Sequence, residues 1–173
     1  MILRPAEHRD VRAIARIIVD YASQGIMLPR SEASIHAALS SYLVAERGGA
    51  IVACGGLHRY SPALAEIFGL ATAPGASGNG AGRAVVEALI AAARAEDIER
   101  VFALTRTPGF FEKLGFYPVQ HTHLPPKIWK DCVTCGKFGN CNEIAMALDL
   151  ADTDRVFNAP IGYNLESSPS NSD

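Results

Sequence analysis

The chain has 173 residues, of which 49% are hydrophobic and 20% charged, and its formal net charge is -2. This length fits one domain, and the apolar content excludes an intrinsically disordered chain. The near balance of charges excludes a broad basic surface for nucleic acid or anionic membranes. The sequence shows neither a long apolar run nor a secretory signal, and therefore predicts a cytoplasmic protein without membrane or nucleic-acid partners.

The first half of the chain alternates between extended and helical patterns. Apolar residues recur at helical spacing in some segments, and short β-compatible runs separate them. In chain order we expect a strand at 2–4, a helix from Val11 to near Gly25, and a second helix with Ser31 as its N-cap and residues 34–39 inside it. Strands are expected at 42–47, 51–58 and 64–72. Gly48-Gly49 predicts a hairpin between two of these strands, because glycine adopts a positive φ at little steric cost.

The second half continues this mixture after a glycine-rich turn. We expect a helix at 83–96, a strand at 100–105, a short helix at 110–114 closed by Gly115, and strands at 116–119 and 143–150. The pattern indicates an α+β or α/β fold with hairpin-like parts around one βαβ unit. One domain is expected over 1–150, including a cysteine-rich loop at 120–142. A tail follows at 151–173, and its residues 166–173 are predicted to be disordered by their composition.

The turn before the longest expected helix holds four glycines between Gly75 and Gly82. A Rossmann fingerprint would need a further glycine where Arg83 or Val85 stands, and a Walker loop would need a lysine that is missing. What remains is a strand, a glycine-rich turn and a helix whose first amides suit a diphosphate. An anion site and a flexible surface turn both stay open at this point.

Several segments in a fixed order carry a resemblance to a known family. They are the strand Leu64–Thr72, the loop Gly78-Asn-Gly80-Ala-Gly82 with its helix, the strand 101–105 and the motif Phe111-Glu-Lys-Leu-Gly-Phe116. Together they resemble the GCN5-related N-acetyltransferase (GNAT) superfamily over about residues 2–150. The resemblance implies a mixed, mostly antiparallel sheet with one splayed parallel strand pair, flanked by helices. It also implies acetyl-CoA as cofactor and a possible homodimer.

The resemblance assigns cofactor contacts residue by residue. The family loop pattern Q/R-x-x-G-x-G/A maps onto Ser77 to Gly82, where Ser77 departs from Gln or Arg. The residues implied to hold the diphosphate of coenzyme A are Ser77, Gly78, Asn79, Gly80, Ala81, Gly82 and Arg83. A backbone N–H near Leu70, Ala71 or Thr72 is implied to stabilise the thioester oxygen.

Five segments narrow the resemblance further: 24–31, 64–66, 104–107, 110–116 and 124–127. They are similar to the acetyltransferase domain of N-acetylglutamate synthases, in a short form without an amino-acid-kinase domain. The implied reaction is acetylation of the α-amine of an amino acid, with L-glutamate as the first choice in arginine biosynthesis. The acetyl group would pass directly from acetyl-CoA to the amine in a ternary complex.

This chemistry needs a base and groups that bind carboxylates. A protonated amine cannot attack a thioester, so Glu66 is the candidate general base, in an apolar strand able to raise a carboxylate's pKa. The candidates for binding the substrate carboxylates are Arg30, Arg106 and Lys127, the arginines because planar guanidinium groups bind carboxylates in bidentate fashion. Phe111 stands where the family often has a tyrosine acid, so the general acid is unassigned.

Three of the four cysteines form the pattern C-x2-C-x5-C at Cys132, Cys135 and Cys141. This spacing suits zinc if His121, His123 or Glu143 supplies a fourth ligand. A local disulfide or redox-sensitive pair and ordinary packing in a loop or lid are the alternatives. For the whole chain, the alternatives to amino-acid acetylation are acetylation of another small amine or a protein N-terminus, and a non-catalytic coenzyme A-binding regulator that responds to metal or redox state.

Overall fold

The computed structural model describes residues 1–120, 124 and 143–151, and in this part of the chain one seven-stranded sheet runs in the order β1-β2-β3-β4-β5-β7-β6. All neighbouring strands are antiparallel except β4 and β5, which are parallel. The strands are β1 (Ile2–Pro5), β2 (Tyr42–Arg47), β3 (Ala50–Ser61), β4 (Leu64–Thr72), β5 (Arg100–Thr105), β6 (Tyr117–Val119) and β7 (Ile144–Asp149). The expected mixed sheet with one parallel pair is therefore confirmed.

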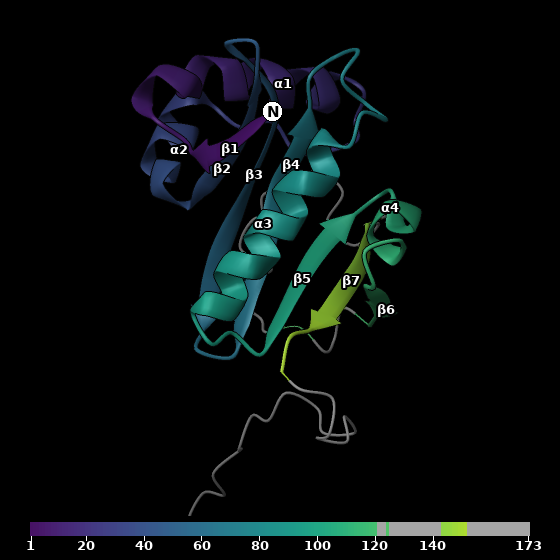
Figure 1. Cartoon of the computed structure of the whole chain (residues 1–173). Coiled ribbons are helices and arrows are strands. Elements are labelled where there is room, and N and C mark those ends of the chain that lie inside the picture. The colour runs from purple at the N-terminus through teal and green to yellow at the C-terminus, as the bar shows by residue number, and fades with distance from the viewer. Residues whose placement is uncertain (121–123, 125–142, 152–173) are drawn as a thin grey trace, which may run out of the picture.

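Helices cover both faces of this sheet (Figure 1). They are α1 (Val11–Ser23), α2 (Glu32–Ala37), α3 (Ala81–Ala95) and α4 (Pro108–Glu112), with 3-10 turns at His8–Asp10 and Leu39–Ser41. The Ser31 side chain accepts a hydrogen bond from the backbone N–H of Ser34 at 3.1 Å, which confirms the predicted N-cap of α2. No helix among the described residues is long and apolar enough to cross a membrane.

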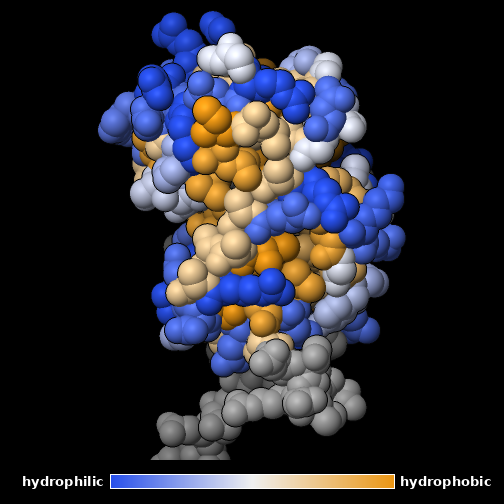
Figure 2. Space-filling view, in the orientation of Figure 1, coloured by the Kyte–Doolittle hydropathy of each residue, from blue (hydrophilic) through white to orange (hydrophobic). Residues whose placement is uncertain are grey.

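Alternate residues of the strands send their side chains to opposite faces and so build two core layers. On one face α3 packs Val85, Val86 and Leu89 against the sheet. On the other, α1 and α2 pack against Val44, Cys54 and other residues of the sheet. The outward side of α3 mixes alanines with charged residues, and Figure 2 shows pale orange and blue alternating there. Strands β2, β3 and β4 contribute to both layers, and β4 is the middle strand of the sheet.

The parallel pair is short, and this creates the opening at the centre of the sheet. β4 and β5 are in register only at Leu64↔Arg100, Ala65↔Val101 and Glu66↔Phe102. β4 continues for six more residues, to Thr72, without a registered partner in β5. The two strands diverge from Glu66 onward, so the splayed strand pair implied by the resemblance is present.

Two predicted helix starts were wrong by two residues, for local reasons. The helix expected at 83–96 begins at Ala81, because Gly80 takes a left-handed conformation (φ 78°) that turns the chain directly into α3. The helix expected at 110–114 begins at Pro108, which suits a first helical turn because its N–H is not needed there. The expected strand at 116–119 begins one residue later, at Tyr117. The strand expected at 51–58 is longer at both ends and spans Ala50–Ser61.

Candidate active site

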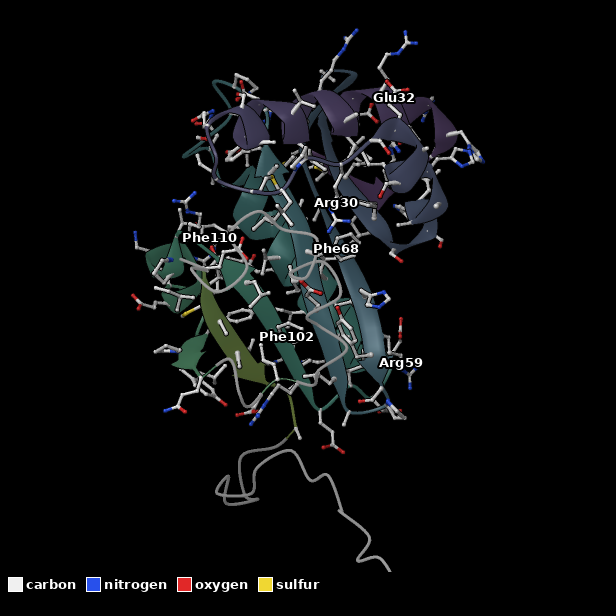
Figure 3. All side chains as sticks on the ribbon, turned by 180° about the vertical axis from the view of Figure 1, so that it is seen from behind. Arg30, Glu32, Arg59, Phe68, Phe102 and Phe110 are labelled. Atoms are coloured by element: carbon white, nitrogen blue, oxygen red, sulfur yellow. The ribbon has the colours of Figure 1, made fainter. Side chains whose placement is uncertain are left out.

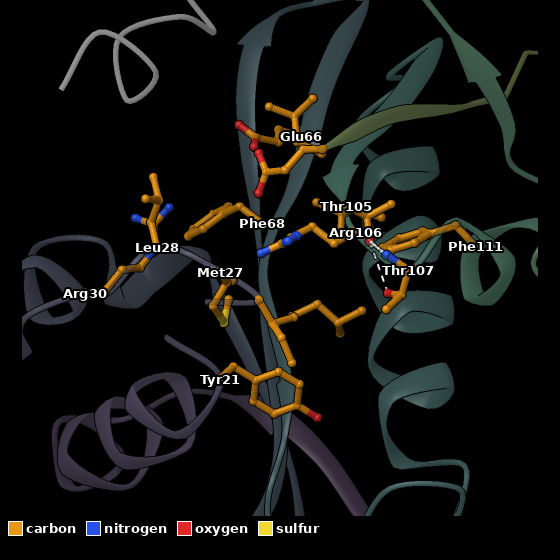
Figure 4. Close-up of a pocket in the computed structure, with 16 residues that line it drawn as sticks. Tyr21, Met27, Leu28, Arg30, Glu66, Phe68, Thr105, Arg106, Thr107 and Phe111 are labelled. Carbon is orange, nitrogen blue, oxygen red and sulfur yellow. Dashed lines mark hydrogen bonds between the residues drawn. The ribbon is translucent and has the colours of Figure 1, made fainter. Parts of the chain in front are cut away.

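A cavity of about 210 Å³ lies where β4 and β5 separate. Its walls come from the α1–α2 connection, the second half of β4 and the segment after β5 (Figure 4). The lining residues are Tyr21, Ile26, Met27, Leu28, Arg30, Glu66, Ile67, Phe68, Gly69, Leu70, Leu104, Thr105, Arg106, Thr107, Phe111 and Glu143. Four of the predicted site residues thus share one cavity: the candidate base Glu66, the candidate carboxylate-binding residues Arg30 and Arg106, and Leu70.

Glu66 stands at the last registered pair before the strands separate, with Phe102 beside it on β5 and His58 beside it on β3. Its Oε2 accepts a hydrogen bond from the Tyr60 hydroxyl at 2.8 Å. The side chain is half-buried and lines the cavity. A carboxylate in this position can take a proton from a group held in the cavity.

The end of β4 is irregular. The register with β3 shifts between Cys54 and Gly56, opposite Gly69, whose φ is 59°. A Cβ on Gly69 would stand 2.8 Å from the Tyr42 hydroxyl, so only glycine fits without displacement. This kink directs the backbone of Leu70 along the cavity, where a main-chain N–H can donate to a ligand.

A chain of hydroxyl groups joins the cavity wall to the glycine-rich loop. The Tyr21 hydroxyl lies 2.7 Å from Thr72 Oγ1, which lies 3.0 Å from Ser77 Oγ. A Cβ on Gly82 would stand 3.1 Å from the methyl group of Thr72, so the first turn of α3 packs closely on this residue. Thr72 therefore fixes the position of the loop relative to β4.

The loop itself has the features of an anion site. Gly80 is the N-cap of α3, and no side chain in the described part of the chain caps the first-turn amides. These amides and the positive end of the helix dipole can bind a diphosphate. The Arg83 Nε donates to Glu87 Oε1 at 2.7 Å along the exposed face of α3, which leaves the other guanidinium N–H groups as possible donors to a ligand. Its predicted contact with the cofactor stays a prediction.

Arg30 is held over an aromatic ring. Its guanidinium carbon lies 5.0 Å from the ring centroid of Phe68, a cation–π contact. Figure 3 shows the two side chains together on the sheet face opposite α3. The Phe68 ring in turn meets Tyr42 edge to face at 5.1 Å. This contact holds the guanidinium at the cavity wall, where it can receive a carboxylate.

Arg106 comes from the other side of the cavity, beyond β5, and lies across Phe68 from Arg30 in the view of Figure 4. Its Nη1 donates a hydrogen bond to the carbonyl oxygen of Gly25, at the end of α1. The contact joins the segment after β5 to the α1–α2 connection across the opening. A guanidinium has five N–H donors, so this bond leaves donors that can bind a ligand.

Two buried polar groups contact residues that line the cavity, Tyr42 at Phe68 and Cys54 at Gly69. Tyr42 is 1% exposed, and its hydroxyl has no hydrogen-bond partner in the described structure. Burial raises the pKa of Tyr42 to about 12, although the nearby Arg30 charge acts in the opposite direction. Burial likewise raises the pKa of the Cys54 thiol to about 12, and its Sγ lies 3.7 Å from the Gly69 carbonyl. Both groups stay protonated at neutral pH, so neither serves as a base.

Several predicted residues lie outside the described part of the chain. They are Lys127, the three clustered cysteines Cys132, Cys135 and Cys141, and the histidines His121 and His123. Glu143, the remaining candidate for a metal ligand, lines the cavity instead. Within the described residues no group of three or more His, Cys, Asp or Glu side chains could hold a metal ion. Zinc at the cysteine segment stays a prediction.

Sequence reasoning missed the neighbours of the charged groups. Phe68 makes the cation–π contact with Arg30, and Tyr60 donates a hydrogen bond to Glu66. A phenylalanine or tyrosine in a strand does not by itself indicate contact with a charged site residue. Thr105 also lines the cavity, where its Oγ1 accepts a hydrogen bond from the Thr107 N–H at 3.0 Å. The β3–β4 hairpin could have indicated the contact of Tyr60 with Glu66, because a turn at 62–63 places these two residues close together on neighbouring strands.

The comparisons with known proteins agree with this geometry. A sequence model described as the acetyltransferase (GNAT) family matches residues 8–116. An uncharacterised N-acetyltransferase of Chlorobaculum tepidum is 38% identical over 148 residues, covering 86% of this chain and 96% of the relative. An amino-acid acetyltransferase of Mycobacterium tuberculosis is 31% identical over 153 residues, which cover 87% of this chain and 85% of the relative.

Solved structures extend the likeness to three dimensions. A Mycobacterium tuberculosis protein in complex with coenzyme A matches with a TM-score of 0.75 and 28% identity, over 87% of this chain and 99% of the other. N-acetylglutamate synthase of Neisseria gonorrhoeae, solved with coenzyme A and N-acetyl-glutamate, matches with a TM-score of 0.79 and 28% identity. The match covers 86% of this chain and 35% of the longer protein. Sequence, sheet topology and the splayed strands concur, and the chain belongs to the GNAT family of acetyltransferases.

Proposed function

We propose that this protein transfers an acetyl group from acetyl-CoA to the α-amine of an amino acid, with L-glutamate as the leading substrate. The observation that carries the proposal is one cavity that combines a carboxylate, Glu66, with the guanidinium groups of Arg30 and Arg106. A base beside two cations suits a substrate that carries an amine and two carboxylates. Relatives named amino-acid acetyltransferase and the synthase bound to N-acetyl-glutamate support the same substrate class.

The residues around the opening fit the proposed cofactor. The uncapped amides of α3 and the loop Ser77 to Gly82 would hold its diphosphate. The gap between β4 and β5 would admit the pantetheine arm, because strand pairing stops at Glu66. Acetyl-CoA supplies the activated thioester.

Each side chain then has a defined task. Arg30 and Arg106 bind the substrate carboxylates and so orient the amine. Glu66 removes the amine proton, directly or through water, which frees the lone pair for attack. A main-chain N–H at Leu70 to Thr72 donates to the acetyl oxygen as negative charge develops there. Phe111 lies at the cavity wall, and because its side chain carries no acidic proton, the proton for the departing thiolate does not come from this position.

The decisive test measures thiol release from acetyl-CoA with each of the twenty amino acids offered separately. We expect turnover with glutamate and a large loss with glutamine, because the second carboxylate is then replaced by a neutral amide. Turnover with uncharged amines or a peptide N-terminus, and none with glutamate, would replace the substrate. Tight coenzyme A binding in calorimetry without turnover on any amine would favour a regulator.

A further inference from the structure

We propose that Tyr60 is a positioning residue for the general base: its hydroxyl holds one oxygen of Glu66 so that the carboxylate stays directed at the cavity. The inference rests on the proposed function, since it assigns a task to a residue that acts through Glu66. Tyr60 itself does not line the cavity. Its contribution to the reaction would therefore pass through Glu66, to whose Oε2 the Tyr60 hydroxyl donates a hydrogen bond at 2.8 Å.

Strand register brings the two side chains together. Glu66 of β4 lies directly opposite His58 of β3, and Tyr60 follows two residues later on the same strand. Such diagonal neighbours across an antiparallel pair are within reach of a long aromatic side chain. The register shifts at Tyr60, between Arg59 and Ser61, and pairing resumes at Ser61↔Leu64.

Aromatic contacts fix the Tyr60 ring on two sides. The His58 ring meets it edge to face, with centroids 4.6 Å apart and an interplanar angle of 86°. The ring of Phe102, which is fully buried, lies 5.9 Å away at 37°. The ring is therefore oriented before any ligand binds, and so is the hydroxyl bond that it carries.

A fixed donor matters because a general base has to be ionised and correctly aimed at the moment of transfer. A phenol O–H that donates to a carboxylate stabilises its charged form and removes rotational freedom from the glutamate side chain. Misplacement of a catalytic group by about an ångström can cost orders of magnitude in rate. The loss of this single bond should therefore slow the chemical step and leave binding intact.

The test replaces Tyr60 by Phe, which keeps the ring and its aromatic contacts. We expect kcat to fall roughly 10-fold, because the base becomes mobile. The KM values for both substrates and the affinity for coenzyme A should change by less than about twofold, since neither binding surface is altered. A KM increase as large as the kcat decrease would overturn the proposal.

Tyr117→Phe is the matched control. The Tyr117 hydroxyl also donates to a carboxylate, Asp149, but this pair joins β6 to the end of β7 and lies outside the cavity lining. It should leave kcat within about twofold of the parent protein. Equal losses in Y60F and Y117F would indicate a general packing effect and overturn the proposal, as would failure of Y60F to unfold cooperatively at a near-parent temperature.

A double-mutant cycle separates this inference from the proposed function. Once Glu66→Gln has removed the base, adding Tyr60→Phe should cost less than about twofold more, because the two residues act as one unit. A further roughly 10-fold loss in the double variant would contradict positioning through Glu66. Full turnover by E66Q alone would contradict the assignment of Glu66 as the base. Slow turnover by E66Q together with parent-like turnover by Y60F would contradict only the role of Tyr60.

Discussion

The two arginines of the cavity differ in how they are restrained. Arg30 is stacked on Phe68, whereas Arg106 donates to the backbone of Gly25. The cation–π contact holds the Arg30 guanidinium at the cavity wall, whereas the Arg106 bond also joins two segments of the protein. Arg30 is therefore the cleaner probe of substrate recognition, because replacing Arg106 would also break that link between segments.

Arg30→Lys should raise the KM for the amino-acid substrate by about 10-fold, because an ammonium group neither stacks as a plane nor binds a carboxylate in bidentate fashion. The KM for acetyl-CoA should stay nearly constant. Steady-state kinetics with each substrate varied in turn measures both values. Arg59→Lys is the control, since Arg59 pairs with Glu96 on the surface and does not line the cavity. A parallel rise in both KM values would show that Arg30 does not select the amino acid.

Gly69→Ala should destabilise the protein by about 2 kcal/mol, the combined effect of a left-handed φ and a new contact with Tyr42. Urea unfolding measures the loss. Gly75→Ala separates the two causes, because Gly75 also has a left-handed φ (76°) but a Cβ there meets nothing within 4 Å. Adding Tyr42→Phe to G69A should recover part of the difference, since the contact is with the hydroxyl. Equal losses in G69A and G75A would remove the contact from the explanation.

At the residue level, the sequence identified the charged groups and missed what holds them. Glu66, Arg30 and Arg106 could be named from residue type and motif, and all three line the cavity. Tyr60 and Phe68 could not, because their roles depend on strand register and on a side-chain direction that no local pattern encodes. Single contacts between distant residues are the part of a site that periodicity leaves undetermined.

At the level of elements, the strongest predictions concerned strands with clear boundaries. The strands at 64–72 and 100–105 were predicted residue for residue, since turn-forming residues bracket apolar runs there. The point at which their pairing ends could not be predicted from propensity, and the family resemblance alone implied the splay. The start of α3 was missed because Gly80 acts as a cap and not as a loop residue.

Thr72→Val should weaken coenzyme A binding about fivefold, because the hydroxyl that joins Tyr21 to Ser77 is lost while the packing against Gly82 remains. Isothermal titration calorimetry with coenzyme A measures the change. Thr72→Ser is the paired variant, since it keeps the hydroxyl and removes only the methyl group. If serine weakens binding more than valine, packing on α3, and not the hydroxyl chain, holds the loop.

At the level of the whole molecule, one charged network ties the N-terminal strand to the rest of the sheet. Arg4 of β1 donates to both carboxylate oxygens of Asp10, at 2.6 and 3.0 Å, and to Glu46 of β2 at 2.8 Å. Asp10 also accepts the backbone N–H of Glu7 at 2.8 Å. The Asp10 side chain is only 5% exposed, so this pair is screened far less by solvent than a surface pair.

Hydrogen bonding by Arg4 holds the pKa of Asp10 below its usual value. Because the folded-state pKa is the lower one, the stabilisation is complete above about pH 4 and disappears as the pH falls through the folded-state pKa. Asp10→Asn should lower the free energy of unfolding by about 2 kcal/mol at pH 7 and by progressively less as the pH falls below about 4. Urea titrations across this range measure the difference.

Glu87→Gln serves as the comparison, because the Arg83–Glu87 pair is exposed on α3. It should cost less than about 0.5 kcal/mol at any pH. An acid-induced loss of stability that persists undiminished in D10N would place the responsible carboxylate elsewhere.

The early end of the pairing between β4 and β5 also determines how the backbone exchanges with heavy water. Past Glu66, amides of β4 directed at β3 belong to a ladder, whereas those directed at β5 face the opening without a registered strand partner in the described structure. Apart from the irregular step at Gly69 and Leu70, successive β4 amides should therefore alternate between slow and fast deuterium uptake. A ligand bound in the opening would slow the fast amides and so reduce this alternation. Deuterium uptake along one strand would then report whether the opening is occupied.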